Sequence, residues 1–223
     1  MSIATRVVRL SPGRDLLVAL GAVCAIEAVV VLAYVATSPG TTAPRYLLYP
    51  FLWLNVAGLA IVTTEAPAAS TRRKALAAAV GVGYLLGLSV VDGTIAFASA
   101  SGIDVFWSLP PGWGPMVVAD LGPLRIAPIP YRTLGYAAIA YLLYVAILDA
   151  SSRMAGGLVG LLSCVSCTFP VIAAAVSGIA GGTGLAAAAA LSYDWAYDLS
   201  TVVFLVTIGA LVWGTTRVRT AFA

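Results

Sequence analysis

The sequence repeats one pattern: a run of about 20 apolar residues, long enough to cross the hydrocarbon core of a bilayer as a helix, followed by a short polar stretch. Six such runs cover residues 16–36, 46–64, 75–91, 133–148, 156–176 and 199–216. Only helices and closed barrels satisfy the backbone inside lipid. The sequence therefore predicts an all-α transmembrane helix bundle with about six spans, built as a single membrane domain over residues 1–223.

Composition supports a chain that is surrounded by lipid. Of its 223 residues, 61% are hydrophobic and only 9% are charged, whereas a soluble domain carries about 25% charged residues. The absence of histidine excludes imidazole ligation of haem, zinc or copper. The run 16–36 exceeds the roughly 7–15 residues of a signal-peptide core and is read as a span. We expect a multi-pass protein of the cell membrane, with the lipid bilayer as its surroundings and no nucleic-acid partner.

Basic and aromatic residues orient the six spans. One side of this layout holds nine basic residues: Arg6, Arg9, Arg14, Arg72, Arg73, Lys74, Arg153, Arg217 and Arg219. The other side holds three: Arg45, Arg125 and Arg132. Basic loops are cytoplasmic, so both termini are expected in the cytoplasm. An aromatic belt is expected at the outer interface, formed by Tyr34, Tyr46, Tyr49, Trp53, Trp107, Trp113, Tyr131, Tyr193, Trp195 and Tyr197.

The segment 92–132 is the one long stretch outside the predicted spans. It holds six prolines, which exclude a long helix, so we expect an extracytoplasmic lid loop. Residues 116–119 and 124–129 flank Asp120-Leu121-Gly122, a pattern that predicts a short hairpin. Trp107 and Trp113 are expected to rest this lid on the bilayer, and a partner-docking surface is the alternative.

Small residues predict close helix contacts inside the spans. Gly83 and Gly87 are four residues apart, as are Gly156 and Gly160. This spacing lets neighbouring helices approach closely. We expect these glycines to pack the bundle itself in preference to a dimer.

The best candidate for chemistry is the pair Cys164 and Cys167 in the fifth predicted span. Cysteines three residues apart share one face of a helix. Pro170 follows three residues later and is expected to break the helix there. A broken helix inside a membrane is tolerated only where protein or a cavity surrounds it. Buried cysteine as a small apolar filler is the structural alternative.

Cys24 and Glu27 form a second pair with the same spacing, in the first span. At 1.5 Å per residue, both pairs lie about 12 and 16 Å from the cytoplasmic side, near the middle of the bilayer. An intramembrane carboxyl is a functional candidate, although Glu27 could instead be hydrogen-bonded to a neighbouring helix. Asn55 is expected to make a helix–helix hydrogen bond.

Two chemistries fit these four residues. Thiolates select Cu(I) or zinc, so Cys164, Cys167, Cys24 and Glu27 could hold or pass a copper or zinc ion. Alternatively, Cys164 and Cys167 form a redox dithiol that exchanges electrons across the membrane. The joint site requires the first and fifth spans to be neighbours.

Two further segments have open interpretations. The run 184–193 is apolar but short, and is a half-helix, a re-entrant piece or an early part of the sixth span. The cluster at residues 193–198 holds Asp194 and Asp198 among aromatic rings. We favour a helix cap there, with Asp198 or Ser200 near the N-cap, over a surface cation site.

A bundle with intramembrane cysteines beside a proline resembles the CcdA/DsbD class of transmembrane thiol–disulfide transporters. Cys164, Cys167 and Pro170 carry the resemblance, with Cys24 as a distant partner; that class places its two reactive cysteines on separate spans. The excess of Arg over Lys and the acidic outer loops are similar to small membrane proteins of halophilic archaea. Some of those proteins are associated with haem–copper oxidases, which implies a respiratory complex or redox protein as partner.

Three functions follow from these observations. The first is thiol redox or metal handling through Cys164 and Cys167, in support of a respiratory metalloenzyme. The second is a structural accessory subunit without chemistry of its own. The third is a small-solute carrier that uses the glycine-rich stretch 178–184. No nucleotide loop, hydrolase elbow or zinc-protease helix is present in the sequence, so a conventional enzyme is not expected.

Overall fold

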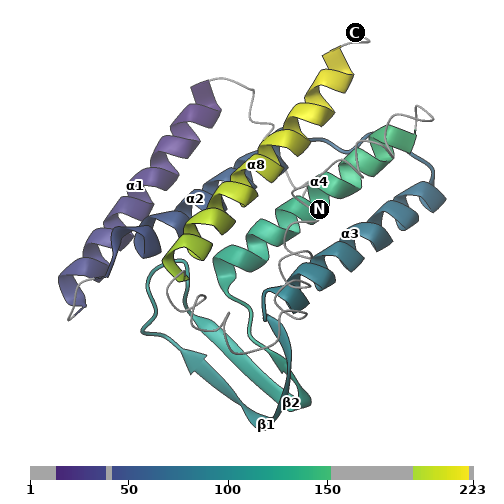
Figure 1. Cartoon of the computed structure of the whole chain (residues 1–223). Helices are drawn as coiled ribbons and strands as arrows, with labels where there is room; N and C mark the ends of the chain where they lie inside the picture. Colours follow the sequence, from purple (N-terminus) through teal and green to yellow (C-terminus); the bar gives the residue numbers. More distant parts are fainter. Residues whose placement is uncertain (1–13, 39–41, 152–192, 221–223) are drawn as a thin grey trace, which may run out of the picture.

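The fold is a helical bundle with a two-stranded β-ribbon at one end (Figure 1). A computed structural model describes residues 14–38, 42–151 and 193–220. Its helices are α1 (Arg14–Thr37), α2 (Pro44–Thr63), α3 (Thr71–Val91), α4 (Pro130–Ser151) and α8 (Tyr193–Thr220). Its strands are β1 (Ile95–Phe106) and β2 (Met116–Ile126), which we call the ribbon. The ribbon lies where α3 ends and where α4 and α8 begin, and we call this the ribbon end of the bundle.

Five of the six predicted spans are confirmed as helices that are long and apolar enough to cross a membrane. They are α1, α2, α3, α4 and α8, and each begins two to six residues before the predicted run. The predicted fifth span, at 156–176, and the run 184–192 lie outside the described residues. The total of six spans and the side on which the termini lie therefore stay predictions.

Helix α4 is the centre of the bundle, because it contacts α2, α3 and α8. Half of its spanning stretch is buried, the largest share among the described helices. Two glycines permit this packing. A Cβ on Gly81 of α3 would lie 3.0 Å from the carbonyl oxygen of Ala140 in α4, and Gly135 of α4 lies directly against the ring of Trp53 in α2.

The predicted packing through Gly83 and Gly87 has no neighbour in the part of the chain that the structure describes, so it stays a prediction. A Cβ at either position would meet nothing within 4 Å there. The contact face of α3 is instead the one that carries Ala77 and Gly81, which are both buried. Gly156 and Gly160 lie outside the described residues.

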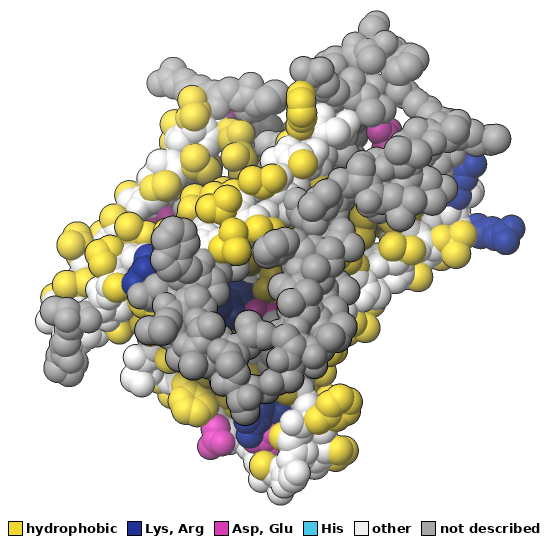
Figure 2. Space-filling view, in the orientation of Figure 1, with side chains coloured by type: hydrophobic (Ala, Val, Ile, Leu, Met, Phe, Trp, Pro, Cys, Tyr) yellow, Lys and Arg dark blue, Asp and Glu magenta, His cyan; other side chains and the backbone are white. Residues whose placement is uncertain are grey.

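The outer surface of the helices is apolar, as a lipid environment requires. Large aliphatic side chains such as Leu17, Ile26 and Leu32 of α1 are more than half exposed. Helix α1 lies at the edge of the bundle beside α2, and none of its spanning stretch is buried. Hydrophobic side chains cover much of the helical surface that Figure 2 shows outside the grey regions.

The ribbon corrects both the all-α prediction and the predicted short hairpin. β1 and β2 pair antiparallel from Ile95 and Ile126 to Phe106 and Met116. The reversal is made by residues 107–115, and Asp120-Leu121-Gly122 lies inside β2. Gly122 has a φ of +73° beside a register shift between Phe97 and Ala100. Gly122, which the sequence pattern places in a turn, therefore accommodates a β-bulge.

Candidate functional site

The predicted thiol site is described only in part. Cys24 is an exposed free cysteine on α1, while Cys164, Cys167 and Pro170 lie outside the described residues. Among residues 14–38, 42–151 and 193–220, no three His, Cys, Asp or Glu side chains are grouped as a metal ion would need. The metal and dithiol roles of the four predicted residues therefore stay predictions.

Glu27 and Asn55 form a polar contact between α1 and α2. The Nδ2 atom of Asn55 donates a hydrogen bond of 2.7 Å to the Oε2 atom of Glu27. Glu27 is half-buried on an otherwise exposed stretch of α1. The predicted helix–helix hydrogen bond of Asn55 is confirmed, and Glu27 accepts it; a role of Glu27 in a metal site stays a prediction. This bond joins α1 to the rest of the bundle.

The ribbon end contains a contact that the sequence analysis missed. Pro50 lies inside α2 and is fully buried. Because proline has no N–H, it cannot donate to the carbonyl four residues earlier, which belongs to Tyr46. The indole Nε1 of Trp113 donates to that same carbonyl oxygen at 2.9 Å. We call residues 107–115 the strap; its tryptophan replaces the hydrogen bond that Pro50 removes.

Aromatic rings from α2, α4, α8 and the strap pack around this contact. Trp113 lies with its ring centroid 5.2 Å from that of Tyr131 and 5.7 Å from that of Tyr197. Tyr46 stacks on Tyr197 at 5.2 Å. Deeper in the bundle, the rings of Trp53 and Phe204 stack at 3.8 Å with an angle of 4° between planes.

This packing corrects part of the predicted aromatic belt. Trp53, Tyr131 and Tyr197 are only 3%, 0% and 5% exposed, so they do not form a belt that faces lipid. The rings come from elements whose ends meet at one place, and they bury one another there. Of the two tryptophans in the strap, Trp107 is 76% exposed and Trp113 is half-buried.

Ion pairs connect the same elements. Arg132 of α4 donates to a carboxylate oxygen of Asp92, at the end of α3, over 2.7 Å. Its guanidinium lies 5.8 Å from the ring centroids of both Trp113 and Tyr131, within the range of a cation–π contact. Arg45 of α2 lies 3.7 Å from Asp198 of α8. Charged groups thus tie the helix ends together around the aromatic rings.

The start of α8 corrects the cap that was predicted near Asp198. Helix α8 begins at Tyr193, so Asp198 and Ser200 lie inside the helix and not near its N-cap. The hydroxyl of Ser200 donates to the carbonyl of Tyr197 within the helix. The aromatic and polar residues at 193–198, predicted to cap the helix, instead form its first turns.

A charge pair within β2 lies beside the β-bulge at which the ribbon bends. Arg125 donates from Nε and Nη2 to the two carboxylate oxygens of Asp120 at 2.6 and 3.0 Å. These hydrogen bonds favour the ionised carboxylate, so they hold the pKa of Asp120 below its usual range.

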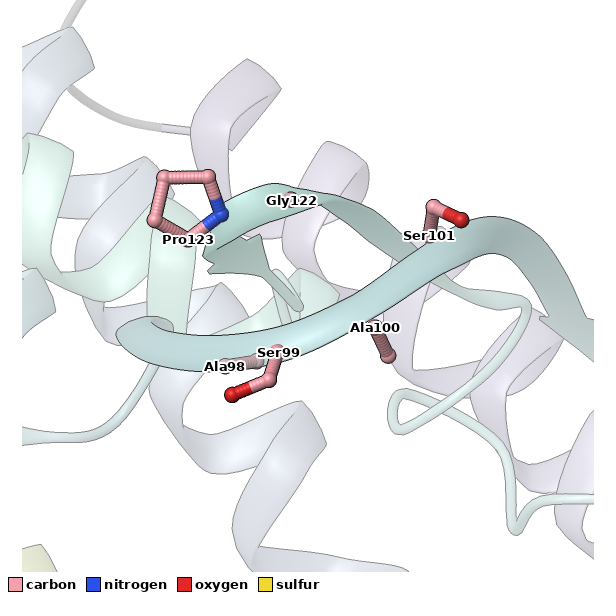
Figure 3. Close-up of a pocket in the computed structure, with 6 residues that line it drawn as sticks. All are labelled: Ala98, Ser99, Ala100, Ser101, Gly122 and Pro123. Carbon is pink, nitrogen blue, oxygen red and sulfur yellow. The ribbon is translucent and has the colours of Figure 1, made fainter.

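At the bend of the ribbon, a shallow open hollow of about 360 Å³ is lined by small residues of both strands (Figure 3). They are Ala98, Ser99, Ala100, Ser101, Gly122 and Pro123.

The two faces of β2 differ in exposure, whereas residues 99–106 of β1 are exposed on both faces. Along β2, Met116, Val118 and Asp120 are buried or half-buried, whereas Val117 and Leu121 are exposed. In the antiparallel register, Val105 pairs with Val117, Ile103 with Ala119, and Ser101 with Leu121. Paired residues point to the same face. We call Ser101, Ile103, Val105, Val117, Ala119 and Leu121 the open face; it is apolar apart from one serine.

Sequence reasoning could have noticed Pro50 as a proline inside a span, which always leaves one carbonyl without its helical donor. It had no means to pair that carbonyl with Trp113, which is 67 residues from Tyr46.

A model of one protein family matches residues 1–218, and its description is a family of unknown function, DUF7546. No curated protein and no solved structure matches the chain.

Proposed function

Because the chain belongs to the DUF7546 family, whose function is unknown, we propose its role from geometry: a multi-pass accessory protein of the cell membrane that presents the open face of its ribbon to a partner protein. The proposal assigns it binding and no reaction of its own. The observation that carries it is an apolar surface on a ribbon that is fixed to the bundle at both ends.

The ribbon is attached to different helices at its two ends. At one end, β1 follows α3 and β2 precedes α4, and the amide of Ala127 donates to the carbonyl of Thr94 at 2.7 Å. At the other end, the strap bonds α2 through Trp113. A two-stranded ribbon is marginally stable alone in water. Attachment at both ends supplies the support that the ribbon lacks by itself.

The open face has the composition of a binding surface. Ile103 is 70% exposed and Leu121 is 57% exposed, and the opposite face of β2, the strand of Leu121, is the more covered one. The two carboxylates of the ribbon, Asp104 and Asp120, pair with Val118 and Gly102 in the register and so belong to that opposite face. Contiguous exposed apolar residues on a folded surface mark interaction sites.

Photo-crosslinking in native membranes tests this role. A benzophenone amino acid replaces Ile103 on the open face or, as the matched control, Val118 on the opposite face. We expect a protein adduct of discrete mass from position 103 only, and Leu121→Asp should abolish it because a carboxylate enters the same apolar surface. Adducts with lipid alone, or equal adducts from both positions, would contradict the proposal.

Thiol redox or metal handling is the second candidate, and the spacing of Cys164, Cys167 and Pro170 supports it. The exposure of Cys24, one helical turn from Glu27, leaves that thiol accessible to a partner group. In this proposal the cysteines pass electrons, or hold copper or zinc, for a respiratory metalloenzyme.

Bound copper and zinc, measured on the purified protein together with its free thiols, test the second candidate. One equivalent of metal that is lost in Cys164→Ser supports metal handling. A disulfide that forms and reduces reversibly supports the redox role. Three unreactive thiols without metal would eliminate both.

A further inference from the structure

The strap binds α2 at the carbonyl that the proline inside that helix leaves without a helical hydrogen bond. The carbonyl of Tyr46 accepts from Trp113 because Pro50 cannot donate to it. Kinks in helices occur at prolines, where the missing bond lets the two halves of the helix move relative to each other. The strap therefore occupies the place where α2 is most easily bent.

A second hydrogen bond and a close contact fix the strap beside Pro50. The carbonyl of Gly112 accepts from the amide of Tyr131 at 3.3 Å, one of the first-turn amides of α4 that have no helical acceptor. Gly112 has a φ of +85°, and a Cβ there would lie 2.4 Å from the Cβ of Pro50. Only glycine allows the strap backbone to reach the proline ring.

The segments of α2 on either side of Pro50 contact different residues of α8. Before the proline, Tyr46 stacks on Tyr197 of α8. One turn after it, the indole of Trp53 donates to the hydroxyl of Thr201 at 3.2 Å. Both halves of α2 thus pack on α8, and a change of angle at Pro50 would move one set of contacts against the other.

We propose that the strap is a latch on a hinge: Trp113 and Gly112 hold α2 at one angle at Pro50, and displacement of the strap releases that angle. The strap then couples the ribbon to the interior of the bundle. This coupling is independent of whether the open face binds a partner, so it goes beyond the function proposed above.

Spin-label distances across α2 test the latch. Labels are placed by Leu48→Cys and Val62→Cys, both at exposed positions, in a full-length chain in nanodiscs whose natural cysteines are replaced by serine. Fourteen residues of straight helix separate the labels by about 21 Å. Trp113→Phe keeps an aromatic ring but removes the donor, and it should broaden this distribution. Trp107→Phe, which changes the exposed tryptophan at the first residue of the strap, should leave it unchanged.

The replacement Pro50→Ala makes the test specific to the hinge. It returns an N–H to the carbonyl of Tyr46, so Trp113→Phe should no longer broaden the distances in that background. Gly112→Ala is a second way to displace the strap. It keeps Trp113, pushes the strap away from Pro50, and should broaden the distances as Trp113→Phe does. Unchanged distances in Trp113→Phe and in Gly112→Ala, or equal broadening by Trp113→Phe with and without Pro50, would overturn the proposal.

Discussion

The contact of Gly135 with the ring of Trp53 predicts that a single methyl group destabilises the bundle. In Gly135→Ala, the new Cβ would lie 2.6 and 3.0 Å from Cε3 and Cζ3 of Trp53 and 3.1 Å from Cε2 of Phe204. The two rings cannot move apart easily, because they stack on each other at 3.8 Å and the indole is bonded to Thr201. The backbone of α4 or the stacked pair must shift.

The expected loss follows from two opposing effects. Replacing glycine by alanine in a helix contributes about 1 kcal/mol of stability. Overpacking a well-filled core costs about 1–3 kcal/mol, and the rigidity of two stacked rings places Gly135→Ala in the upper part of that range. We therefore expect a net loss of about 1–2 kcal/mol in the free energy of unfolding, set by the clash with Trp53.

Gly83→Ala is the matched control, since it makes the same chemical change in α3 where a Cβ meets nothing within 4 Å among the described residues. Unfolding by titration with sodium dodecyl sulfate, followed by circular dichroism, measures both variants in the same micelles. The helix-propensity gain cancels in the comparison, so Gly135→Ala should be less stable than Gly83→Ala by the full cost of overpacking. Equal stability of the two variants would refute the packing that we describe around Trp53.

Three further predictions concern the polar contacts. Asn55→Leu should destabilise the bundle by about 0.6 kcal/mol, the average for a hydrogen bond between membrane helices, whereas Glu27→Gln should cost less because an amide still accepts; the same titration measures both. Asp92→Ala should cost about 1.5–3 kcal/mol, the range for hydrogen bonds to charged groups, because it removes the carboxylate that accepts from the arginine at the start of α4; an unchanged unfolding midpoint would contradict this. The lowered pKa of Asp120 makes its contribution present at neutral pH and lost as the pH falls below the ordinary carboxylate value of about 4. Thermal unfolding between pH 7 and 3 should show this loss in the wild type, and less of it in Asp120→Asn.

Hydropathy was sufficient to locate five helices, since a spanning helix is defined by a length of apolar sequence and little else. It could not place their ends, because polar and aromatic residues also extend the helices beyond the apolar core. Tyr193 begins α8 although the apolar run starts at residue 199. Asp198 was assigned to a cap for the same reason.

The ribbon and its strap were harder to predict, because their determinants lie far apart in the chain. Asp120-Leu121-Gly122 has the local chemistry of a turn, yet a long ladder with β1 overrides it. The partner of the carbonyl that Pro50 leaves free depends on a tryptophan 67 residues from Tyr46. The hydrogen bond of Asn55 to a neighbouring helix was predicted correctly, because a polar group inside a span needs a partner wherever the helices meet.

The bond between Trp113 and Tyr46 also has a consequence for biogenesis. When α2 leaves the ribosome, the residue that completes its hydrogen bonding has not yet been synthesised, and all of α3 and β1 must follow first. Until then the carbonyl of Tyr46 must be hydrated, which retains the first turns of α2 at the water-facing edge of the bilayer. A nascent chain that stops before residue 113 should therefore hold α2 in a shallower position than the finished protein does.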